Sequence, residues 1–152
     1  MKILKNIGFA AILVAGSAQA GNADLVVTQV ANGSSTQFQF DMLNDAGATA
    51  FQFEMKIEGA EGMKMESSNC LSGLPSTHTG ACNLSNGMLK VAVISTSNAV
   101  LTSGSIGSIT ISAPASSLKA SVGGLLVGTP DGAAVNADAI LDGFTAKENF
   151  EK

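Results

Sequence analysis

The sequence contains no tryptophan, no tyrosine and no arginine, and it has one histidine and two cysteines. A chain without arginine and with a net charge of −4 lacks the basic patch that neutralises phosphates, so we expect no nucleic-acid partner. The missing tryptophan and tyrosine remove the flat rings, apolar with a polar handle, that sugar-binding surfaces usually present. A nucleophile needs a base to activate it, and one histidine offers little for that role. We therefore expect no catalytic residues and no cofactor.

The first twenty residues have the pattern of a secretory signal peptide. Lys2 and Lys5 make a positive start, and the apolar run from Ile7 to Ala15 is too short to span a bilayer. The segment Ala18-Gln19-Ala20 fits a cleavage site that requires small residues. We expect cleavage near Ala20 and a secreted protein, either periplasmic or extracellular.

Removal of residues 1–20 leaves a chain long enough for one domain and hardly enough for two. Without Lys2 and Lys5, six lysines remain against twelve acidic residues, a net charge of −6. Residues 146–152 form a polar tail after the domain, which we place at residues 21–145. The tail is charged and carries no apolar segment, so we expect no membrane anchor in the mature chain.

The two cysteines, Cys70 and Cys82, are even in number in a chain that is expected to leave the reducing cytoplasm. This pattern favours a disulfide that closes a short loop. A metal site is the alternative, but it needs two further ligands, and His78 is the only histidine. We interpret His78 as a loop residue and expect no metal.

Most of the chain after residue 24 has a hydrophobic period of two, which is typical of strands. Between the strand-like segments lie glycine, proline, asparagine and serine, spaced about ten residues apart, which is typical of a β-sandwich or a barrel. The strand-like segments are residues 25–30, 36–43, 50–57, 63–67, 89–94, 106–113 and 118–127, with a last strand within 139–145. We expect about nine strands in a two-sheet antiparallel β-sandwich of the jelly-roll type.

Alternation also predicts which side chains point inward. The inward set shares apolar character and a common parity along each strand. It comprises Phe38, Phe40, Phe51, Phe53, Leu89, Val91, Val93, Ile109 and Ile111.

Three local signals refine this pattern. Asn86-Gly87 is typical of a tight turn with positive φ angles. Gly123-Gly124 interrupts a strand and predicts a bulge. Residues 134–144 leave open one or two turns of helix.

The spacing of these elements resembles that of cohesin domains. The resemblance rests on the strand FQFDML, the connection NDAG and the strand AFQFEMKI, which together span Phe38–Ile57. It continues through the Asn-Gly turn before LKVAVIS and through the final segment LLVGTPDGAAVNADAILDG, and so covers essentially the whole mature chain.

The resemblance implies that the two phenylalanine-rich strands lie in opposite sheets, whereas a local interpretation would pair them as a hairpin. It also implies that a protein partner docks on the sheet that contains residues 50–57 and 89–94. The outward positions of those two segments form the expected partner-binding face: Gln52, Glu54, Lys56, Lys90, Ala92 and Ile94.

The expected function is thus a secreted, non-catalytic module that binds a protein at the cell surface or in an extracellular matrix. A carbohydrate-binding or adhesive module of the same fold is the alternative, with a polysaccharide as partner. A small hydrolase is a third hypothesis, and its candidate carboxylate pairs are Glu54 with Glu58 and Asp138 with Asp142.

The segment Asp131–Leu141 resembles the end of a calcium-binding loop. Val127 and Thr129 would occupy the first and third loop positions, where such loops need carboxylate or amide oxygens. We therefore expect no EF-hand site, and weak calcium binding by surface acids stays open.

Overall fold

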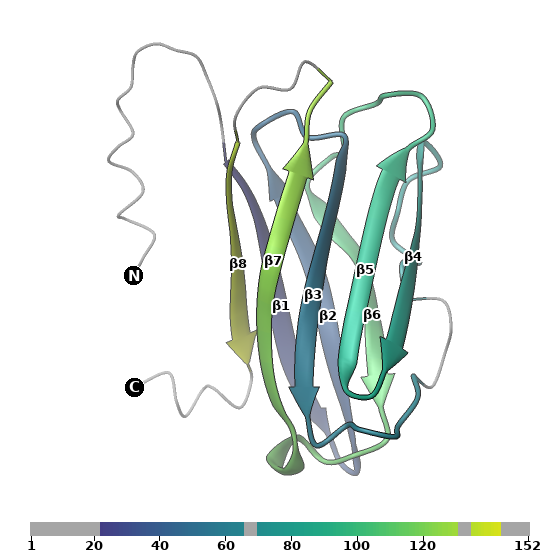
Figure 1. The fold of residues 1–152 in the computed structure, drawn as a ribbon, viewed down its shortest axis with the longest axis vertical. Helices are drawn as coiled ribbons and strands as arrows, with labels where there is room; N and C mark the ends of the chain where they lie inside the picture. Colours follow the sequence, from purple (N-terminus) through teal and green to yellow (C-terminus); the bar gives the residue numbers. More distant parts are fainter. Residues whose placement is uncertain (1–21, 66–69, 131–134, 144–152) are drawn as a thin grey trace.

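The computed structural model describes residues 22–65, 70–130 and 135–143, which form two facing four-stranded sheets (Figure 1). The first sheet contains β1 (Asn22–Asn32), β2 (Ser35–Asn44), β6 (Gly104–Ile111) and β8 (Asn136–Gly143). The second sheet contains β3 (Ala50–Glu58), β4 (His78–Ser85), β5 (Met88–Ser95) and β7 (Lys119–Gly128). A short 3-10 helix, η2 (Ala115–Ser117), precedes β7. The expected β-sandwich is confirmed.

The strand order is β6-β2-β1-β8 in the first sheet and β4-β5-β3-β7 in the second. All neighbouring strands are antiparallel except β1 and β8, which pair in parallel. At one flank of the sandwich β7 and β8 lie side by side, and at the other flank stand β4 and β6 (Figure 1). The sandwich therefore has one flank closed by two strands and one flank that the loops must cover.

Strict alternation builds the core between the sheets. Along β3 every second side chain is buried and the residues between them are exposed, so the strand has one apolar face towards the core and one face exposed to solvent. All nine side chains that the sequence places inside are buried: Phe38, Phe40, Phe51, Phe53, Leu89, Val91, Val93, Ile109 and Ile111.

The chain changes sheets between β2 and β3 because Asn44 holds a sharp corner. Its Nδ2 donates to the carbonyl oxygens of Ala48 at 3.0 Å and Leu101 at 2.6 Å. Its Oδ1 accepts from the backbone N–H groups of Ala46 at 3.3 Å and Ala48 at 3.0 Å. The corner satisfies these backbone groups without a hairpin. The two phenylalanine-rich strands accordingly lie in opposite sheets, as the resemblance implies.

Two expected strand limits need correction. The expected strand at residues 63–67 is reduced to a single bridge between Met65 and Ile111, and residues 66 and 67 lie outside the described residues. The last strand begins earlier than expected, at Asn136, because it pairs with β1 from Asn22 onward. That pairing also excludes helix from residues 136–143.

The interpretation of His78 as a loop residue is wrong. His78 begins β4, pairs with Ser95 and is buried. Its Nδ1 lies 2.9 Å from the Thr77 hydroxyl, and its Nε2 has no hydrogen-bond partner among the described residues. The segment carries glycine, threonine and cysteine rather than an alternating apolar pattern, so its strand character depends on pairing with β5.

The predicted disulfide between Cys70 and Cys82 is confirmed, with Cα atoms 6.5 Å apart. It ties β4 to the loop of residues 70–77, which also contacts β6. There the Gly73 N–H donates to the Ile106 carbonyl at 3.1 Å. The loop thus bridges the flank that no pair of strands closes.

Several expectations concern residues outside the described ranges: the signal peptide at 1–20, the turn at Asp131-Gly132 and the tail at 146–152. In the described part of the chain, no helix has the length and apolar character needed to cross a membrane.

Candidate partner-binding face

The outer surface of the β4-β5-β3-β7 sheet is built from rows of outward side chains that run across all four strands. In one row Ala81, Ala92, Gln52 and Leu126 stand opposite one another. In the next row the order is Asn83, Lys90, Glu54 and Gly123. Because each row crosses the sheet, residues distant in sequence form one continuous surface.

The six residues predicted for this face are all exposed and lie on the two central strands. Gln52 pairs with Ala92 and Glu54 pairs with Lys90. Ile94 lies opposite Thr79 of β4, with 56% of its surface exposed. The structure therefore brings the six residues together on one side of one sheet.

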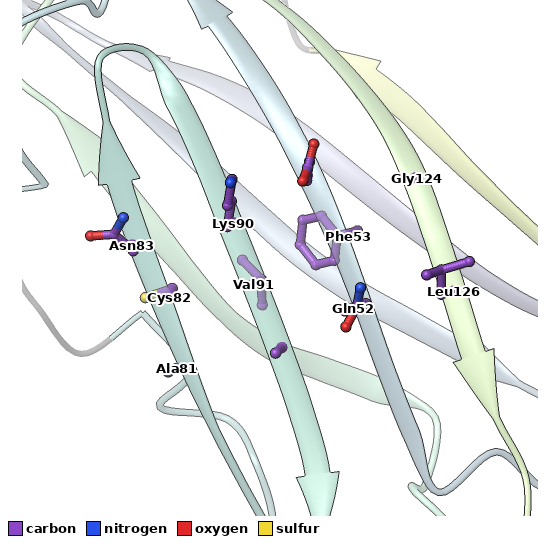
Figure 2. A pocket seen from close by; sticks show the side chains of 11 residues that line it. Gln52, Phe53, Ala81, Cys82, Asn83, Lys90, Val91, Gly124 and Leu126 are labelled. Carbon is purple, nitrogen blue, oxygen red and sulfur yellow. The ribbon is translucent and has the colours of Figure 1, made fainter.

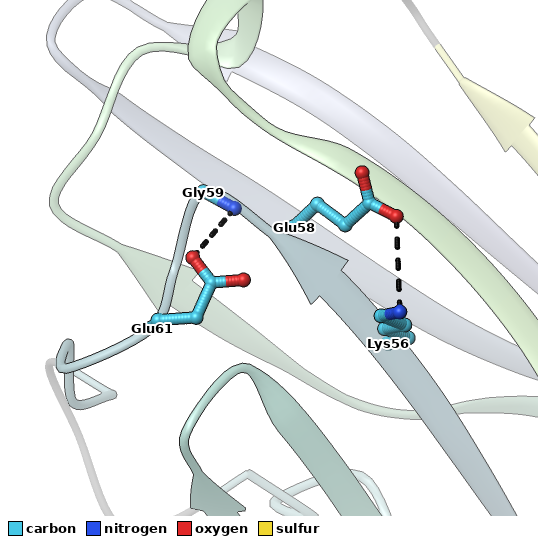
Figure 3. A network of polar contacts seen from close by, with 4 residues as sticks. All are labelled: Lys56, Glu58, Gly59 and Glu61. Atoms are coloured by element: carbon cyan, nitrogen blue, oxygen red, sulfur yellow. Dashed lines mark hydrogen bonds and ion pairs between the residues drawn. The ribbon is translucent and has the colours of Figure 1, made fainter.

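Lys56 is the least central of the six. Its Nζ lies 3.9 Å from a carboxylate oxygen of Glu58 on the same strand, and both side chains are more than half exposed (Figure 3). Beyond the strand end, the Glu61 carboxylate accepts the Gly59 N–H at 3.0 Å and holds the turn that follows β3 (Figure 3). An ion pair this exposed contributes little to stability, so Lys56 is available for a partner.

A shallow depression of about 520 Å³ lies on this face. Its lining includes three small residues, Ala81 and Ala92, which face each other on β4 and β5, and Gly124 on β7. Figure 2 shows Lys90, Gln52 and Leu126 around it, on three neighbouring strands. The lining comprises Gln52, Phe53, Glu54, Ala81, Cys82, Asn83, Lys90, Val91, Ala92, Gly124 and Leu126.

Leu126 is one residue of this face that the sequence analysis did not predict. It is 61% exposed, the most exposed large apolar side chain among the described residues. The predicted bulge at Gly123-Gly124 is confirmed: Gln52 pairs with Leu126 and Glu54 with Gly123, so two residues of β7 stand opposite Phe53. The additional residue reverses the parity of the strand and turns Leu126 outward. Counting parity through the expected bulge would have found it.

Ala81 and Asn83 were missed for a different reason. Both lie on β4, which the sequence pattern did not reveal as a strand. Their signal was the Asn86-Gly87 turn, which has positive φ at both positions (53° and 80°), a geometry typical of a turn that joins two strands of a hairpin.

The carboxylate pairs considered for hydrolysis do not form a catalytic arrangement in the described residues. Glu54 and Glu58 lie four residues apart on one strand, which separates their Cα atoms by about 13 Å at the usual rise per residue. Paired carboxylates in glycosidases stand roughly 5–9.5 Å apart. Asp138 lies on β8, and the side chain of Asp142 is outside the described part. No cluster of three or more potential metal ligands occurs among the residues described.

Comparison with known proteins rests on structure. No family model matches the sequence, and no curated protein matches it. Among solved structures, a non-cellulosomal cohesin from the archaeon Archaeoglobus fulgidus superposes with a TM-score of 0.57 at 12% identity, covering 86% of this chain and 96% of that one. The sixth cohesin of scaffoldin B from Acetivibrio cellulolyticus, solved in complex with a Cel5 dockerin, gives 0.61 at 16% identity, covering 80% and 98%.

A type II cohesin, A11 from Bacteroides cellulosolvens, gives 0.57 at 13% identity and covers 79% of this chain and 99% of that one. The chain has a cohesin-like fold. At these identities the likeness concerns the architecture alone, so the function of the cohesin-like domain has to be argued from its own surface.

Proposed function

We propose that this protein is an exported, non-catalytic binding module that holds a protein partner on the outer face of the β4-β5-β3-β7 sheet. The observation that carries the proposal is the depression between Ala92 and Leu126, beside the opposed charges of Glu54 and Lys90. An apolar centre with a charged rim is the usual anatomy of a protein interface. A solved neighbour of the same fold is itself in complex with a protein, a dockerin.

The partner that fits this face is a folded protein segment with one protruding apolar side chain. The small residues in the lining leave room for such a side chain, and exposed Leu126 on β7 and Ile94 on β5 supply apolar contact. Glu54 and Lys90 favour a partner that carries charges of both signs around its anchor, because each charge buried at an interface needs an opposite one.

A glycan is the less favoured occupant. Every phenyl ring that the structure describes is buried, and the sequence has no tryptophan or tyrosine, so the face has no ring for stacking on a sugar.

Export is supported by the leader pattern and by the disulfide between Cys70 and Cys82, since disulfides persist in oxidising compartments. We place the mature protein at the cell surface or in the extracellular matrix. Fractionation of cells, followed by N-terminal sequencing, tests this part. A mature chain that begins near Gly21 outside the cytoplasm is expected, and an uncleaved cytoplasmic chain contradicts it.

Binding is tested with a partner first captured from the culture proteins and then purified. Titration calorimetry is expected to show at least a tenfold loss of affinity for Glu54→Lys with Ile94→Asp, and a similar loss for Leu126→Asp. The matched control makes the same kinds of change on the opposite sheet, Asp41→Lys with Ile140→Asp, and is expected to bind as the native protein does. Equal binding by the native protein and both face variants would refute the proposed face. Binding to a glycan array instead would replace the protein partner with a sugar.

A further inference from the structure

The free edge of β4 differs from the other three sheet edges. The edges of β7 and β8 lie against each other at the closed flank (Figure 1). The edge of β6 is covered by the Met65 bridge and by the Gly73 N–H. Beyond His78, the edge of β4 has no backbone hydrogen bond to another segment among the described residues. Unpaired strand edges are templates for further strands, so an edge whose backbone groups have no partner requires an explanation.

The direction of the backbone groups on β4 follows from its hairpin with β5. The two-residue turn at Asn86-Gly87 makes Ser85 and Met88 a hydrogen-bonded pair. The backbone groups of every second residue of β4, counted backward from Ser85, then bond to β5. The backbone N–H and C=O groups of the residues between them point away from β5, towards the free edge. The bond from the His78 N–H to the Pro75 carbonyl, at 3.0 Å, agrees with this parity. The residues of β4 whose backbone groups point towards the free edge are Gly80, Cys82 and Leu84.

The strand itself also lacks the residue types that normally prevent association at a sheet edge. β4 contains no lysine, arginine, acidic residue or proline, although twelve acidic residues occur elsewhere in the chain. Its outward side chains are small and neutral: Thr79, Ala81, Asn83 and Ser85. A strand from a second copy can therefore approach without bringing like charges together.

We propose that the protein forms a two-fold dimer in which β4 pairs antiparallel with β4 of a second copy. The two-fold axis passes beside Cys82, so that Cys82 pairs with its equivalent and Gly80 pairs with Leu84 of the second copy. In this register the backbone groups of Gly80, Cys82 and Leu84 of each chain are all paired, and each pair of residues exchanges both N–H···O bonds. It joins two four-stranded sheets into one continuous sheet, with the two depressions on the same side.

The register also determines which β4 side chains on the outer face of the sheet lie opposite each other in the dimer. Ala81 of one copy lies opposite Asn83 of the other, twice, as the symmetry requires. Facing residues at such positions in antiparallel sheets have Cβ atoms about 5 Å apart, which is inside the screening length at moderate salt. Charges placed at these two positions therefore report on both the contact and its register.

The test is sedimentation equilibrium of the mature, disulfide-bonded chain from micromolar to millimolar concentration. The native chain is expected to show a concentration-dependent dimer. Ala81→Glu with Asn83→Glu places acids opposite acids and is expected to weaken the dimer at least tenfold. Ala81→Lys with Asn83→Glu places lysine opposite glutamate and is expected to tighten it severalfold, with the gain shrinking as salt is added.

The control, Ser116→Glu with Ser121→Glu, adds the same charge on exposed residues of η2 and β7, away from β4, and is expected to leave the dimer unchanged. A native chain that stays monomeric throughout overturns the proposal, as does a dimer indifferent to the two glutamates. Weakening by the Lys/Glu variant would overturn the register. If Ala81→Glu with Asn83→Glu fails to fold, the effect of Ala81→Lys with Asn83→Glu on the dimer is the deciding measurement.

Binding at the partner-binding face is measured by titration calorimetry and pairing at the strand edge by sedimentation, so either proposal can fail without the other.

Discussion

The phenyl rings of Phe40 and Phe53 meet edge to face between the two sheets, with centroids 5.5 Å apart and planes inclined at 62°. Phe40 comes from β2 and Phe53 from β3, so the contact joins strands that are consecutive in the chain but belong to opposite sheets. Phe51 stacks on Phe53 with centroids 6.3 Å apart. These rings occupy the centre of the sandwich, where edge-to-face geometry adds to simple burial.

Truncation of this contact is expected to be costly. Phe53→Ala should lower the free energy of unfolding by about 3–5 kcal/mol, through lost burial and the cavity left behind. Gln52→Ala, the neighbouring outward position, should change it by less than about 0.5 kcal/mol. Urea denaturation of both variants measures the difference. Similar costs for the two variants would contradict the assignment of inner and outer faces.

Loss of the disulfide is expected to cost roughly 3 kcal/mol, because the bridge closes a short loop and restricts the unfolded chain. Urea unfolding of the native protein against Cys70→Ala with Cys82→Ala measures this, with the strand content followed by circular dichroism. The variant should remain folded, since the core residues of the two sheets are unchanged. A variant as stable as the native protein would show that the bridge is incidental.

Two glycines of β6 form a matched pair for testing how closely the disulfide loop packs. Both have positive φ, 145° at Gly104 and 151° at Gly107, so alanine is strained at either position. A Cβ at Gly104 meets open space, whereas a Cβ at Gly107 collides with the carbonyl group of Cys70.

Gly107→Ala should therefore destabilise the protein markedly more than Gly104→Ala, by at least about 1 kcal/mol in urea unfolding. Equal destabilisation would mean that the loop does not lie against β6 in solution.

Asp24 is expected to make stability depend on pH. Its pKa is raised above the usual 3.8, first by desolvation on burial and then by the negative charge of Asp138, its pairing neighbour on β8, and more weakly by Asp45. A backbone hydrogen bond from Asp138 opposes the rise without cancelling it. The folded protein therefore holds this proton more tightly than the unfolded chain does, so the contribution of Asp24 favours folding at low pH and is lost as pH rises through its folded pKa.

Asp24→Asn should accordingly be more stable than the native protein at pH 7, and the difference should vanish as the pH falls towards 3. Denaturation of both proteins across this range isolates Asp24 from the other carboxylates, and Asp41→Asn on the neighbouring strand serves as the control. A difference that grows as the pH falls would contradict the direction of the shift.

Local pattern was sufficient for much of the architecture. Alternation in residues 36–43 and 50–57 predicted both strands and the burial of all four phenylalanines, because a period of two fixes the face that each side chain occupies. Turn chemistry predicted the Asn86-Gly87 turn and the Gly-Gly bulge, since few residues adopt positive φ without strain. The same alternation predicted which residues of β3 and β5 are exposed to solvent.

Other features had only an indirect local signal. β4 was missed because glycine, alanine, cysteine and asparagine have weak strand preference, and the strand forms through its pairing with β5. The buried position of His78 follows from that pairing. Leu126 belongs to the candidate face only because the bulge reverses the parity of β7 opposite Phe53.

The sequence by itself determined the strands with a clear period of two, the apolar side chains of the core and the face that each of these strands exposes to solvent, because side-chain parity is a property of the local backbone. The tertiary structure decided which strands are neighbours, which strand edge has no backbone partner among the described residues and where the depression lies. These properties depend on contacts between residues far apart in the chain, such as the hydrogen bond between Asn44 and Leu101, and no local period encodes such contacts.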